Sequence, residues 1–134
     1  MILAAPKITR LAFRFHAFYF FFWAAFFELM PRQVMGWLGL DMPDNPIGWV
    51  AANVAAGGLL TAGALFFLAS RHKRVPRIAL GAALVQTAFN LYHDAVWLVG
   101  FRNQPQLWLV VLDTVIIGSL FLVYVRAWRT AEHA

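Results

Sequence analysis

The chain has 134 residues, of which 62% are hydrophobic and only 13% are charged, and its formal net charge is +5. A soluble domain carries about 25% charged residues because its surface faces water, so this composition excludes an ordinary water-soluble domain and favours one domain within a lipid bilayer. Cysteine is absent, which excludes disulfides and thiolate metal sites. The basic residues flank apolar stretches, which argues against a nucleic-acid-binding protein.

Four apolar stretches each approach or exceed the roughly 20 residues that a helix needs to cross the hydrocarbon core. They cover residues 11–30, 47–69, 78–100 and 107–125, and prolines stand before or after them at Pro31, Pro46 and Pro76. We predict an all-α bundle of four transmembrane helices in up-down-up-down order, forming a single domain over residues 1–134. The first stretch is longer than the apolar region of a signal peptide and has no small-residue cleavage site after it, so we expect it to be retained.

The first span is strongly aromatic, since ten of the 15 residues from Phe13 to Phe27 are Phe, Tyr or Trp. A helix that is apolar all round suits lipid contact or burial between neighbours. The same aromatic surface, with Trp23 at its centre, would also suit a flat pigment, a quinone or a partner helix.

The outer loop, residues 31–46, mixes apolar and polar residues and predicts a short helix along the membrane surface. The second span carries small residues four apart, Ala52/Ala56 and Gly58/Ala62, which predict close helix packing. The turn at residues 101–105 is short, so the third and fourth spans should be antiparallel neighbours.

Lysine and arginine placement predicts the orientation, because cytoplasmic loops carry an excess of both. Nine of the 11 basic residues lie at the N-terminal side of the first span, between the second and third spans, or after the fourth, and only Arg32 and Arg102 lie in the other two loops. We therefore expect a bacterial cytoplasmic (inner) membrane protein whose N- and C-termini are both cytoplasmic.

Ionisable and amide side chains inside the spans are costly in lipid and indicate function by default. At about 1.5 Å of rise per residue, six of them fall in the outer half of the bilayer: Glu28, Asn53, Asn90, His93, Asp94 and Asp113. We predict a polar cluster in which His93 meets Asp94 or Asp113 and the two asparagines complete the hydrogen bonds. Such a cluster either fixes helix register or forms a site for a small molecule, a quinone, a proton, or a haem or other metal centre.

His16 and His93 are the candidate pigment or haem ligands, together with Trp23 as a contact residue. One haem held by both histidines is excluded by depth, since they lie roughly 13 Å apart along the membrane normal. Near the inner boundary, beside Arg14, His16 suits a solvated or headgroup-facing position better.

The ingredients above resemble the small four-helix DoxX-like membrane proteins of bacteria. The resemblance rests on the aromatic first span, the loop Pro31-Arg32-Gln33, the small-residue second span and the segment Asn90-Leu91-Tyr92-His93-Asp94. It implies a quinone-adjacent role, because some DoxX-like proteins are subunits of quinone-linked oxidoreductases. It implies no catalytic residue here.

Three functional hypotheses follow. No nucleotide-binding, hydrolase or metalloprotease motif is present, which favours a non-catalytic accessory subunit of a respiratory or photosynthetic membrane complex, packed against lipid, partner subunits, quinone or a chlorophyll-type pigment. The second hypothesis is an independent quinone- or haem-linked redox protein that uses the outer polar cluster. The third is a small transporter or proton pathway, which the few polar groups of the inner halves argue against.

Overall fold

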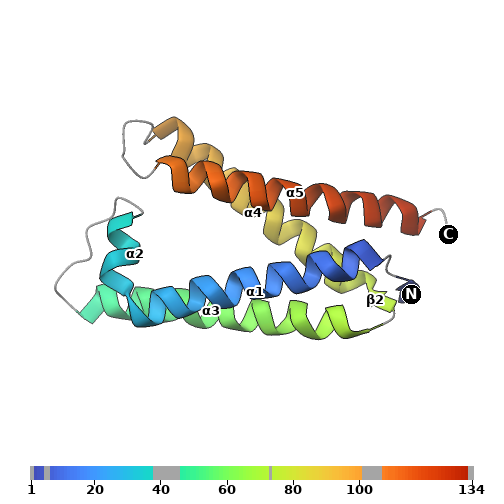
Figure 1. Ribbon diagram of the computed structural model, residues 1–134, viewed down its shortest axis with the longest axis horizontal. Coiled ribbons are helices and arrows are strands. Elements are labelled where there is room, and N and C mark those ends of the chain that lie inside the picture. Colours follow the sequence, from blue (N-terminus) through green and yellow to red (C-terminus); the bar gives the residue numbers. More distant parts are fainter. Residues whose placement is uncertain (1, 5–6, 38–45, 73, 101–106, 133–134) are drawn as a thin grey trace.

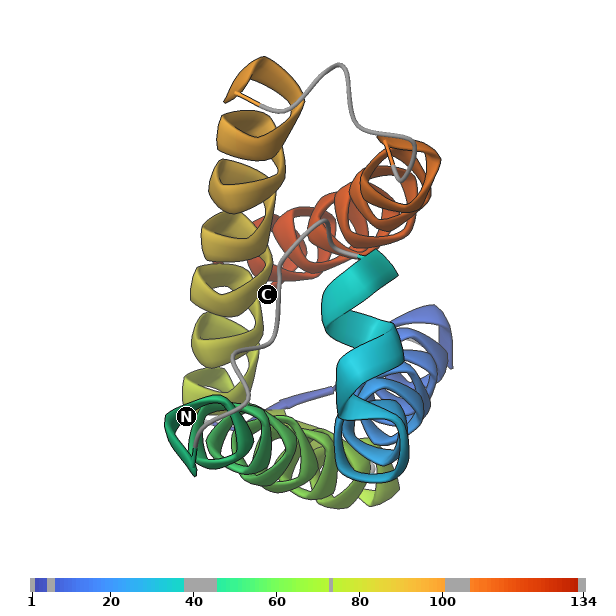
Figure 2. The same cartoon turned by 90° about the vertical axis from the view of Figure 1, so that its left-hand side faces the viewer.

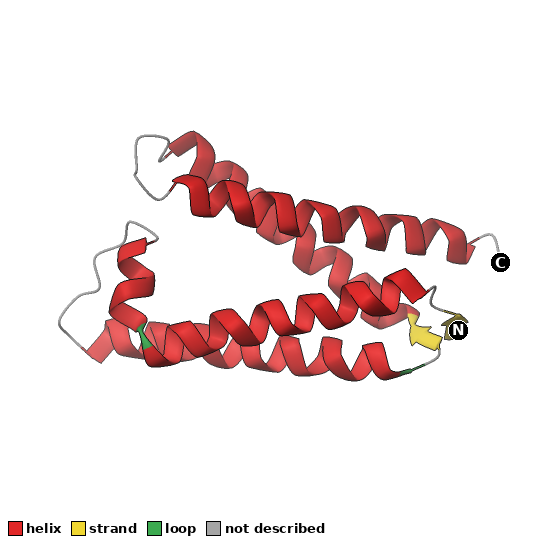
Figure 3. Ribbon diagram, viewed as in Figure 1, coloured by secondary structure: helices red, strands yellow, loops and turns green. Residues whose placement is uncertain are grey.

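The computed structural model describes residues 2–4, 7–37, 46–72, 74–100 and 107–132, and these ranges are almost entirely helical (Figures 1 and 3). They contain helices α1 (Lys7–Leu29), α2 (Pro31–Trp37), α3 (Pro46–Arg71), α4 (Arg77–Gly100) and α5 (Leu107–Glu132). Two three-residue strands, β1 (Ile2–Ala4) and β2 (Arg74–Pro76), pair antiparallel. The all-α prediction is confirmed, and each long helix overlaps one predicted apolar stretch.

The four long helices form two pairs. Helix α1 packs along α3, and α4 packs along α5. The two pairs meet at the end that holds both termini and β2, and they diverge toward the end that holds α2 (Figure 1). Viewed from that diverging end, α2 rises from α1 into the space between the pairs (Figure 2).

The short helix α2 follows α1 with almost no interruption. The amide of Met30 donates to the carbonyl of Phe26 at 2.9 Å, and the amide of Val34 donates to the carbonyl of Met30 at 3.0 Å. Pro31 opens α2, where its missing N–H costs nothing. Helix α2 lies within the predicted outer-loop helix; residues 38–45 of that loop, like the turn at 101–106, lie outside the described residues.

Helices α1 and α3 approach closely at Gly63. A Cβ built on Gly63 would lie 2.7 Å from the Phe21 ring and 3.1 Å from the Ala17 carbonyl oxygen. Ala52 and Ala56 of the predicted packing pair are also buried. The expectation that Gly58 makes a close helix contact is wrong, because a Cβ there would meet only open space. Gly58 and Gly63 lie on different faces of α3, and only the face that carries Gly63 meets α1.

The core joins all four long helices around buried aromatic residues. Phe13 packs edge-on against Phe66 of α3 at 5.5 Å between ring centroids and lies 5.0 Å from Tyr124 of α5. Leu80 and Ala83 bring α4 into the same cluster. The core therefore lies where the two pairs meet, not where they diverge.

Basic residues gather at the end with the termini. Lys7 begins α1, Arg71 ends α3, Arg77 begins α4, and Arg126 and Arg129 lie in the last turns of α5. The pairing of β1 with β2 holds the N-terminal segment against the α3–α4 connection. The sequence argument grouped these same segments on one side, and no strand was expected there.

The outer surfaces of all four long helices are apolar. Exposed side chains include Phe18 at 60% on α1, Leu60 at 54% on α3, Val85 at 71% on α4 and Val115 at 61% on α5. Two helices of the described residues are long and apolar enough to cross a membrane, over Gly48–Arg71 in α3 and Leu107–Thr130 in α5. Helices α1 and α4 do not meet the same criterion, so the four-span prediction stands only in part.

Candidate functional site

A cavity of about 610 Å³ lies between the diverging helix pairs. Its wall takes residues from the α2-side halves of α1 and α4, from α5 near its start and from α3. The lining comprises Tyr19, Phe20, Trp23, Phe27, Ala55, Leu59, Asn90, His93, Asp94, Trp97, Leu109, Val110 and Asp113. The cavity between the pairs is thus lined by aromatic, aliphatic and polar side chains.

Two carboxyl groups from neighbouring helices meet in this cavity. The side chains of Asp94 of α4 and Asp113 of α5 interact with each other, and both line the cavity. The pair also cross-links α4 to α5 at the open end of the bundle.

Each carboxyl has a second partner. The Tyr19 hydroxyl of α1 donates to Oδ1 of Asp113, and the Trp23 ring, one turn further along α1, packs edge-on against the Tyr19 ring at 6.3 Å between centroids. On the other side, the Thr114 hydroxyl lies 3.0 Å from Oδ2 of Asp94 and 2.8 Å from the carbonyl oxygen of Val110. A continuous polar chain therefore runs from α1 through the acid pair to α5.

Asn90 and His93 extend the polar wall along α4. Gln86 donates to the side-chain oxygen of Asn90 at 3.2 Å. His93 is exposed and stacks edge-on against Phe89 at 4.4 Å. The predicted cluster residues Asn90, His93 and Asp94 of this helix thus line the cavity, but within the described part of the chain His93 forms no hydrogen bond with either aspartate.

Two members of the predicted cluster do not line the cavity. Asn53 of α3 and Glu28 of α1 are both exposed side chains, and neither is among the lining residues. Depth along the helix was compatible with the cluster, but both residues lie on outward faces of their helices. The cluster as the structure has it consists of Asn90, Asp94 and Asp113 with His93 at its edge.

His16 contradicts the expectation of a solvated or headgroup-facing side chain. It is 0% exposed, its Nδ1 lies 3.2 Å from the Tyr124 hydroxyl, and Phe20 and Phe66 pack on its ring at 4.4 and 4.7 Å. His16 therefore lies in the core between α1, α3 and α5, and its role as a pigment or haem contact stays a prediction. Trp23 and His93 keep access to the cavity.

The sequence argument missed Tyr19 and Thr114. Tyr19 stands among nine other aromatic residues and was counted with the apolar surface of the first span, and Thr114 was not among the candidate site residues. One signal was available, because a tyrosine hydroxyl buried within a span needs a hydrogen-bond partner. The identity of that partner depends on how α1 is rotated against α5.

Among the described residues, no three histidine, aspartate or glutamate side chains come together in the manner of a metal site. Comparison with protein-family models, with curated proteins and with solved structures gives no match to this chain. The DoxX-like resemblance therefore stays an expectation, and the geometry of the cavity carries the functional argument.

Proposed function

We propose that this chain is a four-span protein of the bacterial cytoplasmic membrane, with both termini inside, that binds a flat, uncharged molecule of the quinone type in the cavity between its helix pairs. We assign it the binding of that molecule and not its oxidation or reduction. The observation that carries the proposal is the cavity of about 610 Å³ in which an acid pair, a tyrosine and aromatic rings face one space.

The membrane placement is supported by where the apolar surface lies. In a soluble protein a helix as apolar as α3 or α5 forms the core, yet only 22% and 17% of their most apolar windows are buried within the structure. Large apolar side chains are equally exposed on α1 and α4. Exposed apolar surface of this extent is unfavourable in water and favourable in lipid, which favours four spans over two.

The polar residues of α1 and α4 are compatible with membrane-spanning helices. The ionisable residues that lower the hydropathy of α4, Asp94 and His93, face the cavity, and the basic residues of α1 lie toward the end with the termini. Polar residues in spans typically face a bundle interior or a cavity. A helix with such a lining can cross a membrane while failing a test based on composition alone.

The lining favours an uncharged ligand that accepts hydrogen bonds. None of the lining residues is lysine or arginine, so the site offers an anion no countercharge. A carboxyl group donates in its protonated form, and the amide of Asn90 and the ring of His93 also donate, so this wall can supply hydrogen bonds to carbonyl oxygens. Trp23, Phe27 and Trp97 supply flat surfaces for a ring, since aromatic rings favour stacked or edge-on contacts.

The test is a binding titration of the purified full-length chain in detergent with a short-chain benzoquinone, followed by tryptophan fluorescence and native mass spectrometry. Asp113→Asn keeps the shape of the side chain and an oxygen that can accept from Tyr19, but it replaces one of the two carboxyl groups of the acid pair by an amide. We expect its affinity to fall roughly tenfold, because hydrogen bonds to charged or proton-sharing groups contribute about 1.5–3 kcal/mol. Solvent extraction of the chain from its membrane should also release a quinone.

The matched control is Glu28→Gln, which removes one carboxylate from the same protein at a position outside the cavity. It should bind the quinone as the unchanged chain does. Equal affinities for all three proteins would refute the assignment of the cavity, and so would tighter binding of an organic cation than of the quinone, because the acid pair would then act as a countercharge.

A second function, an accessory subunit of a larger energy-transducing complex, is favoured by one feature of α1. Phe15, Phe18 and Phe22 are 50%, 60% and 54% exposed, which gives α1 an aromatic outer face that suits a partner helix or a pigment. The DoxX-like resemblance points in the same direction. Gentle solubilisation followed by native mass spectrometry tests it, and recovery of the chain only as a free monomer would contradict it.

A further inference from the structure

A second pocket, of about 530 Å³, opens at the opposite end of the molecule from the quinone-type cavity, between α1 and α5. Ile8 and Thr9 of α1 form one side, and residues of α5 between Leu122 and Thr130 form the other. This is the end at which the basic residues gather, and the proposed topology places it at the cytoplasmic surface of the membrane.

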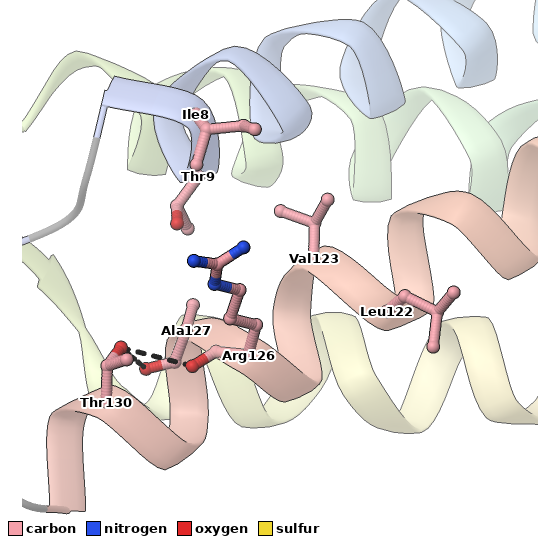
Figure 4. A pocket seen from close by; sticks show the side chains of 7 residues that line it. All are labelled: Ile8, Thr9, Leu122, Val123, Arg126, Ala127 and Thr130. Atoms are coloured by element: carbon pink, nitrogen blue, oxygen red, sulfur yellow. Dashed lines mark hydrogen bonds between the residues drawn. The ribbon is translucent and has the colours of Figure 1, made fainter.

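Two hydrogen-bond donors face each other across this pocket. The guanidinium of Arg126 extends from α5 toward the hydroxyl of Thr9 (Figure 4). Thr9 is only 2% exposed, and within the part of the chain that the structure describes its Oγ1 has no hydrogen-bond partner. A buried hydroxyl without a partner is costly, so this atom is open to a ligand that accepts its proton.

The third polar side chain of the pocket is already engaged. The Thr130 hydroxyl lies 3.1 Å from the carbonyl oxygen of Arg126 and 3.0 Å from that of Ala127, so its proton is used by the backbone (Figure 4). Arg126 and Thr9 are therefore the donors available to a bound group. Both would favour an acceptor, and the guanidinium favours a negatively charged one.

The charge and the walls of the pocket further restrict the class of ligand that it can bind. None of the lining residues is acidic, so the lining supplies no countercharge to Arg126. Toward the middle of the bundle the wall becomes apolar, with Leu122 69% exposed and Val123 partly exposed. A ligand that fills this pocket has an anionic head at the end with the termini and an apolar tail along α5.

We propose that this pocket binds the phosphate of an anionic phospholipid, with the phosphate on Arg126 and Thr9 and an acyl chain against Leu122. Guanidinium groups bind phosphate through charge-assisted, often bidentate hydrogen bonds. The inference rests on the proposed membrane placement but not on the quinone-type ligand, because the two sites share no lining residue.

The test measures lipid retention by native mass spectrometry on the full chain purified in detergent, with phosphatidylglycerol and phosphatidylcholine of identical acyl chains. We expect phosphatidylglycerol to be retained preferentially and Arg126→Gln to weaken it roughly tenfold or more. Arg129→Gln is the matched control, since it removes the same charge three residues further along α5 at a residue outside the lining. Thr9→Val, which keeps the volume of the side chain, should weaken retention about threefold.

Four outcomes would overturn the proposal. Equal losses in Arg126→Gln and Arg129→Gln would show that only overall charge matters, and equal retention of phosphatidylcholine would show that net headgroup charge is not recognised. Displacement of the lipid by millimolar inorganic phosphate would identify a soluble anion as the ligand. Unchanged retention of phosphatidylglycerol by Arg126→Gln would show that the lipid does not bind at this pocket. A thermal melt without added lipid verifies that each variant is folded. Quinone binding, measured in the same variants, should be unaffected.

Discussion

Gly63→Ala is the sharpest test of how α1 and α3 pack. The new methyl group would lie 2.7 and 2.9 Å from two atoms of the Phe21 ring and 3.1 Å from the backbone oxygen of Ala17. The ring can turn away, but the backbone oxygen can yield only if α1 moves. Overpacking of this kind costs about 1–3 kcal/mol. We expect Gly63→Ala to lower the free energy of unfolding by that amount relative to a control variant that has the same change in helix propensity.

Gly58→Ala supplies that control. It introduces the same methyl group on the same helix, five residues earlier, where nothing lies within 4 Å. Any gain in helix propensity from replacing glycine, up to about 1 kcal/mol, is common to both variants. The difference in unfolding free energy between them therefore isolates the packing cost at Gly63.

The assay is equilibrium unfolding of both variants in mixed detergent micelles, followed by circular dichroism. Gly63→Ala should be the less stable by about 1–3 kcal/mol. Adding Phe21→Ala to Gly63→Ala should recover part of the loss, because the ring is one of the two obstacles. Equal stability of the two alanine variants would refute the packing of α1 on α3 as the structure has it.

Two further predictions concern the core and the cavity. Tyr124→Phe removes the hydroxyl that lies 3.2 Å from His16 Nδ1, so it should lower the free energy of unfolding by about 1–3 kcal/mol. The double variant with His16→Leu should lose less than the sum of the two single losses, because it also removes the imidazole left without a partner. Strict additivity of the losses would contradict this coupling. Ala55→Phe should fill part of the cavity and lower the affinity for the benzoquinone about tenfold or more. Ala51→Phe, at an exposed position of α3, should leave the affinity unchanged. Equal affinities of the two variants would place the ligand elsewhere.

The helices themselves were readable from the sequence. Runs of apolar residues with prolines at their boundaries placed the ends of the four long helices to within four residues, except that α5 continues seven residues beyond its predicted end. The mixed composition after Pro31 predicted the short helix α2. The polar stripe on the third span was also readable, because three-and-four spacing puts Asn90, His93 and Asp94 on one side of a helix. Local spacing determines these features, so no tertiary information was needed.

The composition of the site was only partly readable, because it depends on how each helix is rotated. Asn53 and Glu28 lie at suitable depths but on outward faces, while Tyr19 lies inward among residues that look equally apolar. His16 was misjudged for the same reason. A signal existed in α1, where the small residues Ala12, Ala17 and Ala24 mark the buried face that His16 shares. Pairing between helices, which fixes the acid pair and its partners, has no local signature.

The central claim is that the exposed apolar faces of all four long helices meet lipid. Because the chain has no native cysteine, single cysteines can be introduced without background at Phe18, Leu60, Val85 and Val115, one on each long helix, with Gln33 as a water-exposed control in α2. The measurement is the rate of labelling by a membrane-impermeant maleimide in intact and in permeabilised cells.

We predict that the four helix positions are protected in both preparations and that the control at Gln33 is labelled in intact cells. Rapid labelling of the α1 and α4 positions after permeabilisation, with α3 and α5 still protected, would show that only two helices cross the membrane. That result would contradict the account.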